Sequence, residues 1–151
     1  MSNPYLSKFQ IIGTSIKAFK IRNDFVSLGD ISNIKRVIDV SHSVPTLELV
    51  NDGETYYGIV VLKIKTTVSS NKKKYVVDLT IEGCFNAPSE LGENTFREML
   101  KINGVTSLYG IARGFVQSTT SQTLVSGSIL LPMYNVAAYS KDLDVAETQD
   151  N

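Results

Sequence analysis

The stretch that decides the fold runs from Ile102 to Tyr139 and reads INGVTSLYGIARGFVQSTTSQTLVSGSILLPMYNVAAY. Its first half spaces apolar residues by three and four positions, which places their side chains on one side of a helix. These residues are Val105, Leu108, Tyr109, Ala112, Phe115, Val116 and Thr119. Gly110 and Gly114 each cost about 1 kcal/mol relative to alanine, so the helix needs a surface to lie on. We expect a sheet against one face and a second helix against the other; the alternative is an ordinary core helix that tolerates both glycines.

The residues before this helix predict antiparallel strands. Residues 57–69 and 73–85 alternate apolar with polar side chains, and the sequence SSNKKK between them supplies a turn. Residues 36–44 are typical of a half-buried strand, and Asn-Asp-Gly at 51–53 is a strong turn signal. Residues 8–22 predict a long strand with a bulge or bend at Gly13 to Ser15.

The order of these elements predicts the fold class. The strands come first, and a short helix marked by Phe96 to Ile102 and ended by Asn103 and Gly104 precedes the long one. We expect an α+β fold: a four-stranded antiparallel sheet, arranged as a meander, with a long helix and a shorter helix packed on one face. Residues 1–141 should form a single domain, and residues 142–151 an acidic, disordered tail.

Charge and hydropathy narrow the classes of partner. Lys plus Arg and Asp plus Glu both number 15, so the formal net charge is zero and neither nucleic acid nor an anionic membrane is a favoured partner. No apolar run reaches the roughly 18 residues that span a bilayer, and the amino terminus lacks the pattern of a signal peptide. The single cysteine, Cys84, excludes an internal disulfide. We expect a cytoplasmic protein without direct membrane insertion.

Catalytic chemistry has little support in the sequence. His42 is the only histidine, Cys84 has no basic partner nearby in the chain and is expected to be a small buried hydrophobe, and no glycine-rich phosphate loop is present. The strand carboxylates Asp39, Asp78 and Glu82 fall on predicted solvated faces. We expect no enzyme, no cofactor and no metal site, while a small α+β ligand-binding or isomerase-type domain stays an alternative.

Two short motifs carry a resemblance to a known family. The long helix holds Leu-Tyr-x-x-Ala-Arg at 108–113, and after a Ser/Thr-rich connection the chain holds Leu-Pro-x-x-Asn-Val at 131–136. This half of the chain resembles the SecB export chaperones, and the likeness extends upstream to about Phe9. The resemblance implies an ATP-independent holdase that binds unfolded polypeptides, because several shallow apolar grooves together hold an extended chain tightly.

The resemblance also implies an assembly. Proteins similar to SecB form a homotetramer, a dimer of dimers, that pairs through the long helices. The glycines and apolar residues on that helix agree with such contacts, since small residues let two backbones approach closely. The expected oligomer interface residues are Gly110, Ala112, Gly114 and Phe115.

The family's client groove lies near a crossover loop and the last helix. In this chain the loop is Asn23 to Lys35, and it has no tryptophan. The client-binding residues implied are Phe25, Val26, Leu28, Ile31, Tyr134 and Tyr139. The alternative is that the four loop residues only anchor the loop to the core.

A contact with the SecA motor is implied at Val76 and Asp78, which precede Gly83 to Phe85 as in the family's pattern. Export chaperones also carry acidic residues on the first strand, where this chain has Ala18 and Arg22. That departure weakens the expectation of export. SecB-like chaperones dedicated to an antitoxin of a toxin–antitoxin system are the other branch to which the chain could belong.

Overall fold

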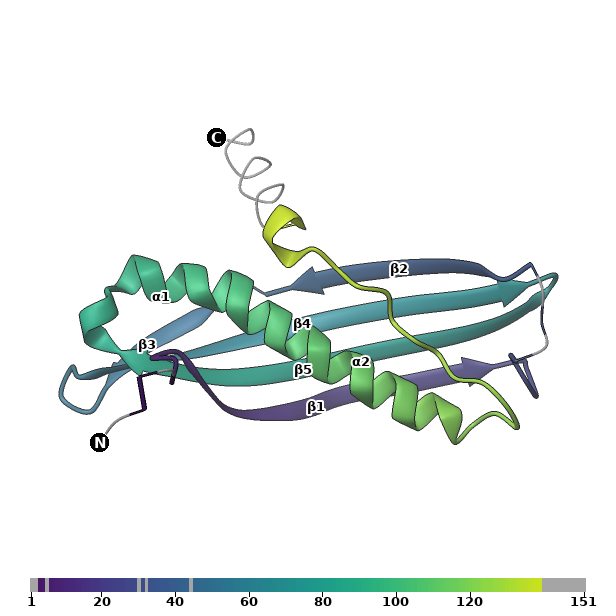
Figure 1. Cartoon of the computed structure of the whole chain (residues 1–151), viewed down its shortest axis with the longest axis horizontal. Helices are drawn as coiled ribbons and strands as arrows, with labels where there is room; N and C mark the ends of the chain where they lie inside the picture. Colours follow the sequence, from purple (N-terminus) through teal and green to yellow (C-terminus); the bar gives the residue numbers. More distant parts are fainter. Residues whose placement is uncertain (1–2, 5, 30, 32, 44, 140–151) are drawn as a thin grey trace.

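A computed structural model describes residues 3–4, 6–29, 31, 33–43 and 45–139. These residues form an antiparallel sheet with one long, bent helix across one face (Figure 1). The predicted α+β class is confirmed. The strands are β1 (Gln10–Asn23), β2 (Lys35–His42), β3 (Thr46–Val50), β4 (Thr55–Ser70) and β5 (Lys73–Pro88). The predicted acidic tail lies outside the described residues.

The sheet has one strand more than predicted and a different order. The order is β1-β5-β4-β2, and β3 follows β2 along the same edge of β4. The short β3 precedes the predicted turn, where Asn51, Asp52 and Gly53 all have positive φ. The meander is wrong because the loop after β1 carries the chain from one edge of the sheet to the other. β1 is irregular, but not where the bulge was predicted: the register shifts, at Ile11/Gly13 and Ile16/Ala18, lie on either side of Gly13 to Ser15, which pair regularly with β5.

The two long central strands supply the floor of the core. β4 and β5 pair in register, for example Leu62 with Ile81 and Ile64 with Leu79, so that apolar side chains align in rows on one face. The predicted alternation is confirmed over both strands. The fully buried residues of this face include Val60, Leu62, Ile64, Val68, Tyr75, Val77, Leu79, Ile81 and Phe85.

The two predicted helices are joined without a break into one long, bent helix. After the 3₁₀ turn η1 (Ser89–Leu91), α1 (Glu93–Met99) passes through the π-helical turn η2 (Leu100–Gly104) into α2 (Val105–Ser121). The predicted stop at Asn103 and Gly104 is therefore wrong. Leu100, Gly104 and Val105 are all buried, and this packing outweighs the helix-breaking tendency of the glycine.

Glycines on the strands, not on the helix, let the helix approach the sheet. A Cβ on Gly58 would lie 2.5 Å from Cδ1 of Leu100, and one on Gly83 would lie 2.6 Å from Cδ2 of Leu108. A Cβ on Gly110 or Gly114 would have no atom within 4 Å. Within one chain the predicted close approach at the two helix glycines is absent, because both face away from the sheet.

Candidate functional site

An extended segment after α2, residues 124–134, runs back over the sheet beside the helix, and we call it the strap (Figure 1). Three side chains of α2 hold its backbone. Ile129 N donates to Thr120 Oγ1 (2.8 Å), Arg113 Nε donates to Leu131 O (2.8 Å), and Tyr109 Oη donates to Pro132 O (2.5 Å). The Leu-Tyr-x-x-Ala-Arg motif thus fixes the Leu-Pro motif in place.

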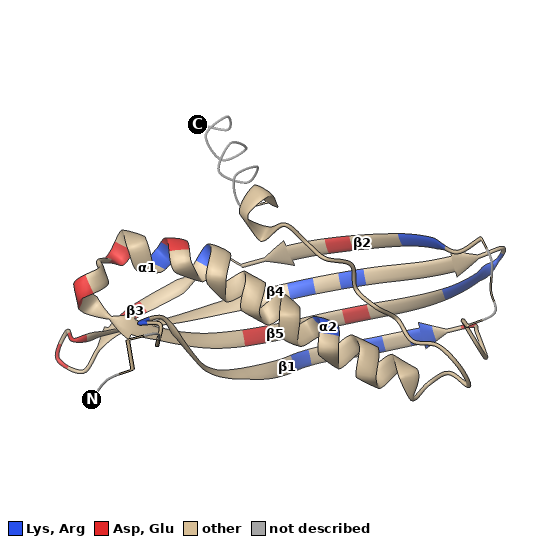
Figure 2. Ribbon diagram, in the orientation of Figure 1, with Lys and Arg blue, Asp and Glu red and all other residues tan. Residues whose placement is uncertain are grey.

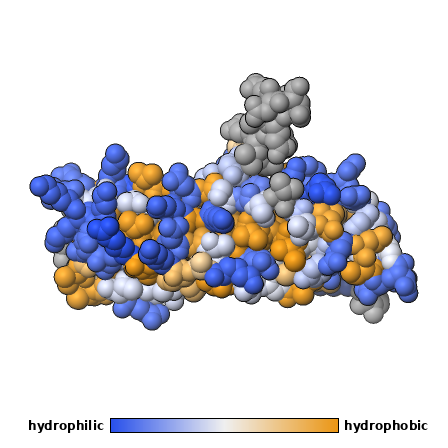
Figure 3. Space-filling view, turned by 180° about the vertical axis from the view of Figure 1, so that it is seen from behind, coloured by the Kyte–Doolittle hydropathy of each residue, from blue (hydrophilic) through white to orange (hydrophobic). Residues whose placement is uncertain are grey.

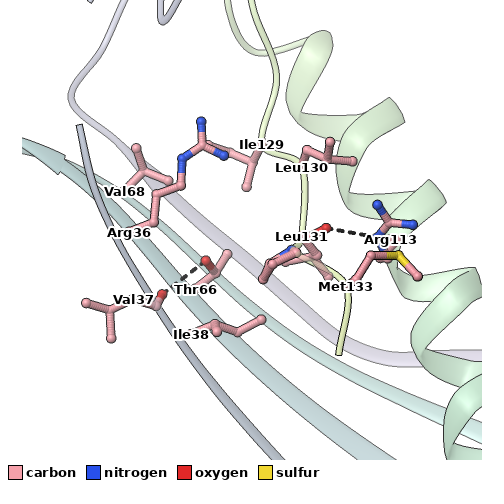
Figure 4. Close-up of a pocket in the computed structure, with 11 residues that line it drawn as sticks. Arg36, Val37, Ile38, Thr66, Val68, Arg113, Ile129, Leu130, Leu131 and Met133 are labelled. Carbon is pink, nitrogen blue, oxygen red and sulfur yellow. Dashed lines mark hydrogen bonds between the residues drawn. The ribbon is translucent and has the colours of Figure 1, made fainter. Parts of the chain in front are cut away.

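The strap and the neighbouring edge of the sheet enclose a groove of about 520 Å³ (Figure 4). Ile38 on β2 points toward the strap, and Thr66 and Val68 on β4 continue the floor. The groove is lined by Arg36, Val37, Ile38, Thr66, Val68, Arg113, Ile129, Leu130, Leu131, Pro132 and Met133. Most of this lining is aliphatic, so the groove favours apolar side chains.

The strap has side chains that are buried in the core and others that are exposed beside the groove. Ile129 and Leu131 are buried at 2% and 0% exposure, while Leu130 and Met133 are 43% and 82% exposed beside the groove. Large exposed apolar side chains along a groove mark a binding surface when they cluster. Methionine also adapts its shape to different partners, because its side chain is unbranched and flexible.

Polar groups at the groove come mainly from the edge of the sheet. β2 is the last strand of the described sheet, so the backbone groups on its outer side have no strand partner there. Thr66 Oγ1 already donates to Val37 O (3.2 Å), and Arg113 is held by Leu131. The Arg36 guanidinium contacts no other described residue through a hydrogen bond or ion pair, so it is available to a bound carbonyl or carboxylate.

The predicted crossover loop contributes less surface than expected. Phe25 and Leu28 are only 6% and 8% exposed, and Ile31 is half-buried. Their burial follows from pairing of the loop with the strap, since Leu28 N donates to Ser126 O (3.0 Å) and Val125 N donates to Val26 O (2.8 Å). Phe25 and Leu28 therefore belong to the core of the described structure, and a client could reach them only if the loop moved.

Of the four loop residues expected to bind a client, Val26 is the one that presents its side chain to solvent, with 72% exposure. Val125, its neighbour on the strap, is 83% exposed. The hydroxyls of Ser27 and Ser126 are hydrogen-bonded beside them. These two valines form a second small apolar surface at the end of the strap.

Tyr134 and Tyr139 are half-buried in a row of aromatic rings at the end of the strap, and neither lines the groove. Tyr134 lies 5.5 Å from Tyr109 and 5.7 Å from Tyr139, and Tyr139 lies 5.5 Å from His42, measured between ring centroids. Burial, with a smaller contribution from Tyr134, raises the pKa of the Tyr139 hydroxyl, so Tyr139 keeps its proton at physiological pH. His42 Nδ1 lies 3.0 Å from Ser43 O.

The residues predicted for the motor contact lie on the other face of the sheet. Val76 is half-buried and Asp78 is exposed, and the strand register places Arg22 opposite Val76 and Lys20 opposite Asp78. On the other side of β5, Lys65 also pairs with Asp78. Cys84 lies on this face as well and is half-buried rather than buried as predicted, because the helices cover the opposite face of the sheet.

The predicted oligomer residues divide between two surfaces. Gly110 and Gly114 face outward on α2 beside Ile111, which is 41% exposed. Ala112 is fully buried in the core of its own chain. Phe115 is half-buried, with its ring edge-on to Phe19 of β1 at 4.9 Å.

Sequence reasoning missed most of the groove. The strap stands out in the sequence only for its Leu-Pro-x-x-Asn-Val motif, and that motif does not show that Ile129 and Leu131 are buried while Leu130 between them is exposed. Arg36 and Val37 could not be assigned, because the edge position of β2 is a property of the sheet order. Within residues 3–139, excepting the few that are not described, no cluster of three His, Cys, Asp or Glu side chains suits a metal ion, and no helix is both long and apolar enough to cross a membrane.

Comparison with protein-family models and with curated proteins gives no match. Among solved structures, the chain is similar to the Mycobacterium tuberculosis SecB-like chaperone Rv1957, which was solved in complex with a ChAD peptide from the Rv1956 HigA1 antitoxin. The TM-score is 0.59 at 11% identity, over 83% of this chain and 90% of that chain. A Streptococcus agalactiae protein of unknown function is similar with a TM-score of 0.49 at 12% identity, over 83% of this chain and 97% of that one. The first likeness shows that the fold is SecB-like.

Proposed function

We propose that this protein is an ATP-independent holdase chaperone that binds unfolded polypeptide segments in the groove between the strap and β2. The observation that carries the proposal is an aliphatic groove beside the edge strand of the described sheet, with Leu130 and Met133 exposed along it. An unfolded segment offers both apolar side chains and unpaired backbone groups, and a folded protein hides both. A groove of this kind therefore selects non-native chains without reading a sequence.

The SecB-like neighbour supports this proposal, because that chaperone was solved with a bound peptide from an antitoxin. For the present chain a dedicated antitoxin client is the narrower form of the proposal that this neighbour favours. The other narrow form is an export chaperone that delivers preproteins to SecA from the cytoplasm. The cations Lys20, Arg22 and Lys65 around Asp78 weigh against it, because like charges repel a cationic partner.

A catalytic role has less support than binding. The groove is open along the strap, and its lining offers no acid, base or nucleophile beyond Thr66, whose hydroxyl is engaged with Val37. We propose that the chain is not an enzyme and needs no cofactor.

The proposal is tested by the aggregation of a chemically unfolded client protein diluted into buffer without nucleotide. The wild-type chain should suppress light scattering, and Leu130→Ser with Met133→Ser should suppress it much less. The matched control is Leu6→Ser with Leu49→Ser, which removes two residues of similar exposure (68% and 53%) that do not line the groove. Equal activity of both double variants would place client binding elsewhere, and an inactive wild-type chain would exclude a general holdase.

A further inference from the structure

Acidic and basic residues are unevenly distributed along the long axis of the molecule although the formal net charge is zero (Figure 2). Acidic residues gather at the end that carries α1 and the β3–β4 turn, including Asp52, Glu54 and Glu93. Basic residues gather on the strands toward the opposite end of the sheet. Composition alone predicted no charged patch, because the two groups cancel in the sum.

The basic residues surround a shallow basin on the face of the sheet that α2 does not cover, the face toward the viewer in Figure 3. The basin has a volume of about 360 Å³ and is lined by Lys20, Arg22, Lys65, Thr67, Lys74, Val76 and Asp78. We call it the cationic basin. In Figure 3 hydrophilic side chains crowd the end of the face that holds it.

The strand register fixes how these charges are arranged. Lys20, Asp78 and Lys65 form one row across β1, β5 and β4, and Arg22, Val76 and Thr67 form the next row. Neighbouring strands are separated by about 4.8 Å, so Lys20 and Lys65 lie about 10 Å apart with Asp78 between them, and Lys20 and Arg22 are about 7 Å apart along β1. Like charges at this spacing repel, and a bound anion would relieve the repulsion.

Among the described residues, three carboxylates lie near the four cations, but none of them forms an ion pair with a cation of the basin. Asp78 is the only acidic residue in the lining, and Asp39 lies opposite Lys65 from β2. Asp24 accepts a hydrogen bond from Lys74 N (3.1 Å) at the strand end. In the part of the chain that the structure describes, no ion pair involves Lys20, Arg22, Lys65 or Lys74, whereas Lys17, on the same face, pairs with Glu82 at 3.9 Å.

We propose that the cationic basin binds an acidic segment of a partner polypeptide. The excess of cations in the lining indicates, by charge complementarity, that the partner is negatively charged. The mixed lining identifies its class, because Val76 offers an apolar contact, Thr67 a hydroxyl and Asp78 an acceptor for a peptide N–H. A phosphodiester backbone would use only the cations and would leave Val76 without an apolar contact, and the basin has no aromatic side chain on which a base could stack.

This site is separate from the groove. The basin lies on the exposed face of the sheet, and the groove lies under the strap on the covered side, so an acidic partner and an unfolded client can be bound together. The inference therefore stands or falls independently of holdase activity.

The test is fluorescence anisotropy with the full chain and a fluorescein-labelled peptide of repeated Glu-Ala-Ser units. The reference probes are the same peptide with glutamine for glutamate and a labelled oligothymidylate of equal charge. Lys65→Glu should weaken binding of the acidic peptide by about tenfold, since it turns an attraction into a repulsion. The matched control is Lys63→Glu, which makes the same charge change on the same strand and face but outside the lining. A circular dichroism melt confirms that both variants are folded.

The proposal expects binding of the acidic peptide only, weaker binding at higher salt, and a much larger effect of Lys65→Glu than of Lys63→Glu. It is overturned if the acidic peptide does not bind, or if the glutamine peptide or the oligothymidylate binds as tightly. Equal losses in Lys65→Glu and Lys63→Glu would also overturn it, because binding would then follow total charge and not the basin.

Discussion

Gly58 and Gly83 are the residues that set the distance between the helix and the sheet. Gly83→Ala would push a methyl group into Leu108, and we expect a loss of about 1–3 kcal/mol in the free energy of unfolding from overpacking. Gly110→Ala is the control: no atom lies within 4 Å of its Cβ, so alanine should stabilise the helix by up to about 1 kcal/mol. Urea denaturation measures both. A neutral Gly83→Ala variant would contradict this packing.

Tyr75 links stability to pH in the alkaline range. Its ring is fully buried, its hydroxyl lies 2.5 Å from Thr123 Oγ1, and burial raises its pKa. The folded state therefore keeps the phenol proton longer than the unfolded state, whose tyrosines titrate near about pH 10. The contribution of the Tyr75 hydroxyl to the free energy of unfolding is complete below that pH. This contribution is lost as the pH rises through the pKa of Tyr75 in the folded state.

We expect the midpoint of thermal unfolding to fall above about pH 10 and to fall less steeply in Tyr75→Phe. At neutral pH the free energy of unfolding of the phenylalanine variant should fall by about 1 kcal/mol, because the hydrogen bond to Thr123 is lost. The loss should be no larger, since the Thr123 hydroxyl is exposed enough to bind water instead. Identical alkaline slopes in the two proteins would mean that other groups control the transition.

Among the elements, the strap depends on α2 for its position. Arg113→Met keeps the aliphatic bulk but removes the hydrogen bond to Leu131 O. We expect faster hydrogen exchange in residues 128–134, unchanged exchange in β4 and β5, and weaker client binding, because the groove loses its fixed wall. Hydrogen exchange read by mass spectrometry separates these regions. Unchanged exchange in the strap would show that Ile129 and Tyr109 hold it without Arg113.

The sequence predicted the individual strands better than it predicted which strands lie side by side in the sheet. Alternation along residues 57–69 and 73–85 identified both long strands and their buried faces, because one face of each strand is buried along its length. It could not give the pairing of β1 with β5, since the crossover loop has no periodicity. It also left open whether Phe25 and Leu28 bind a client or anchor the loop to the core, because their burial depends on the strap, which is about 100 residues later in the chain.

At the scale of the whole molecule, the outer face of α2 offers a surface for assembly. Gly110, Ile111 and Gly114 are exposed there, and we propose that this face pairs copies into the tetramer that a SecB-like holdase would use. Gly110→Leu with Gly114→Leu should leave the monomer fold intact, because neither position is crowded within one chain.

Light scattering at micromolar concentration should give a mass near four times 16.6 kDa for the wild-type chain and a smaller mass for the double leucine variant. Circular dichroism is the control for folding. A wild-type mass of a single chain would exclude this assembly, and an unchanged mass in the variant would move the interface away from α2.

The same charges also separate the two kinds of partner proposed for the exposed sheet face. Arg22→Glu should weaken the binding of an acidic peptide to the cationic basin. The same change should strengthen the binding of a cationic motor protein such as SecA at Val76 and Asp78. Titrations of both partners at low and physiological salt measure the two signs. Tight SecA binding by the wild-type chain, insensitive to Arg22→Glu and to Asp78→Lys, would contradict the influence assigned to these charges.

The central claim is that the groove recognises polypeptides because they are unfolded. The most direct measurement is calorimetric titration of the wild-type chain with one protein in two forms, native and permanently unfolded by reduction and alkylation of its cysteines. We predict binding of the unfolded form alone, without nucleotide, and at least about tenfold weaker binding by the Leu130→Ser, Met133→Ser variant. Equal affinity for the native form, or an affinity that the groove variant leaves unchanged, would contradict the claim.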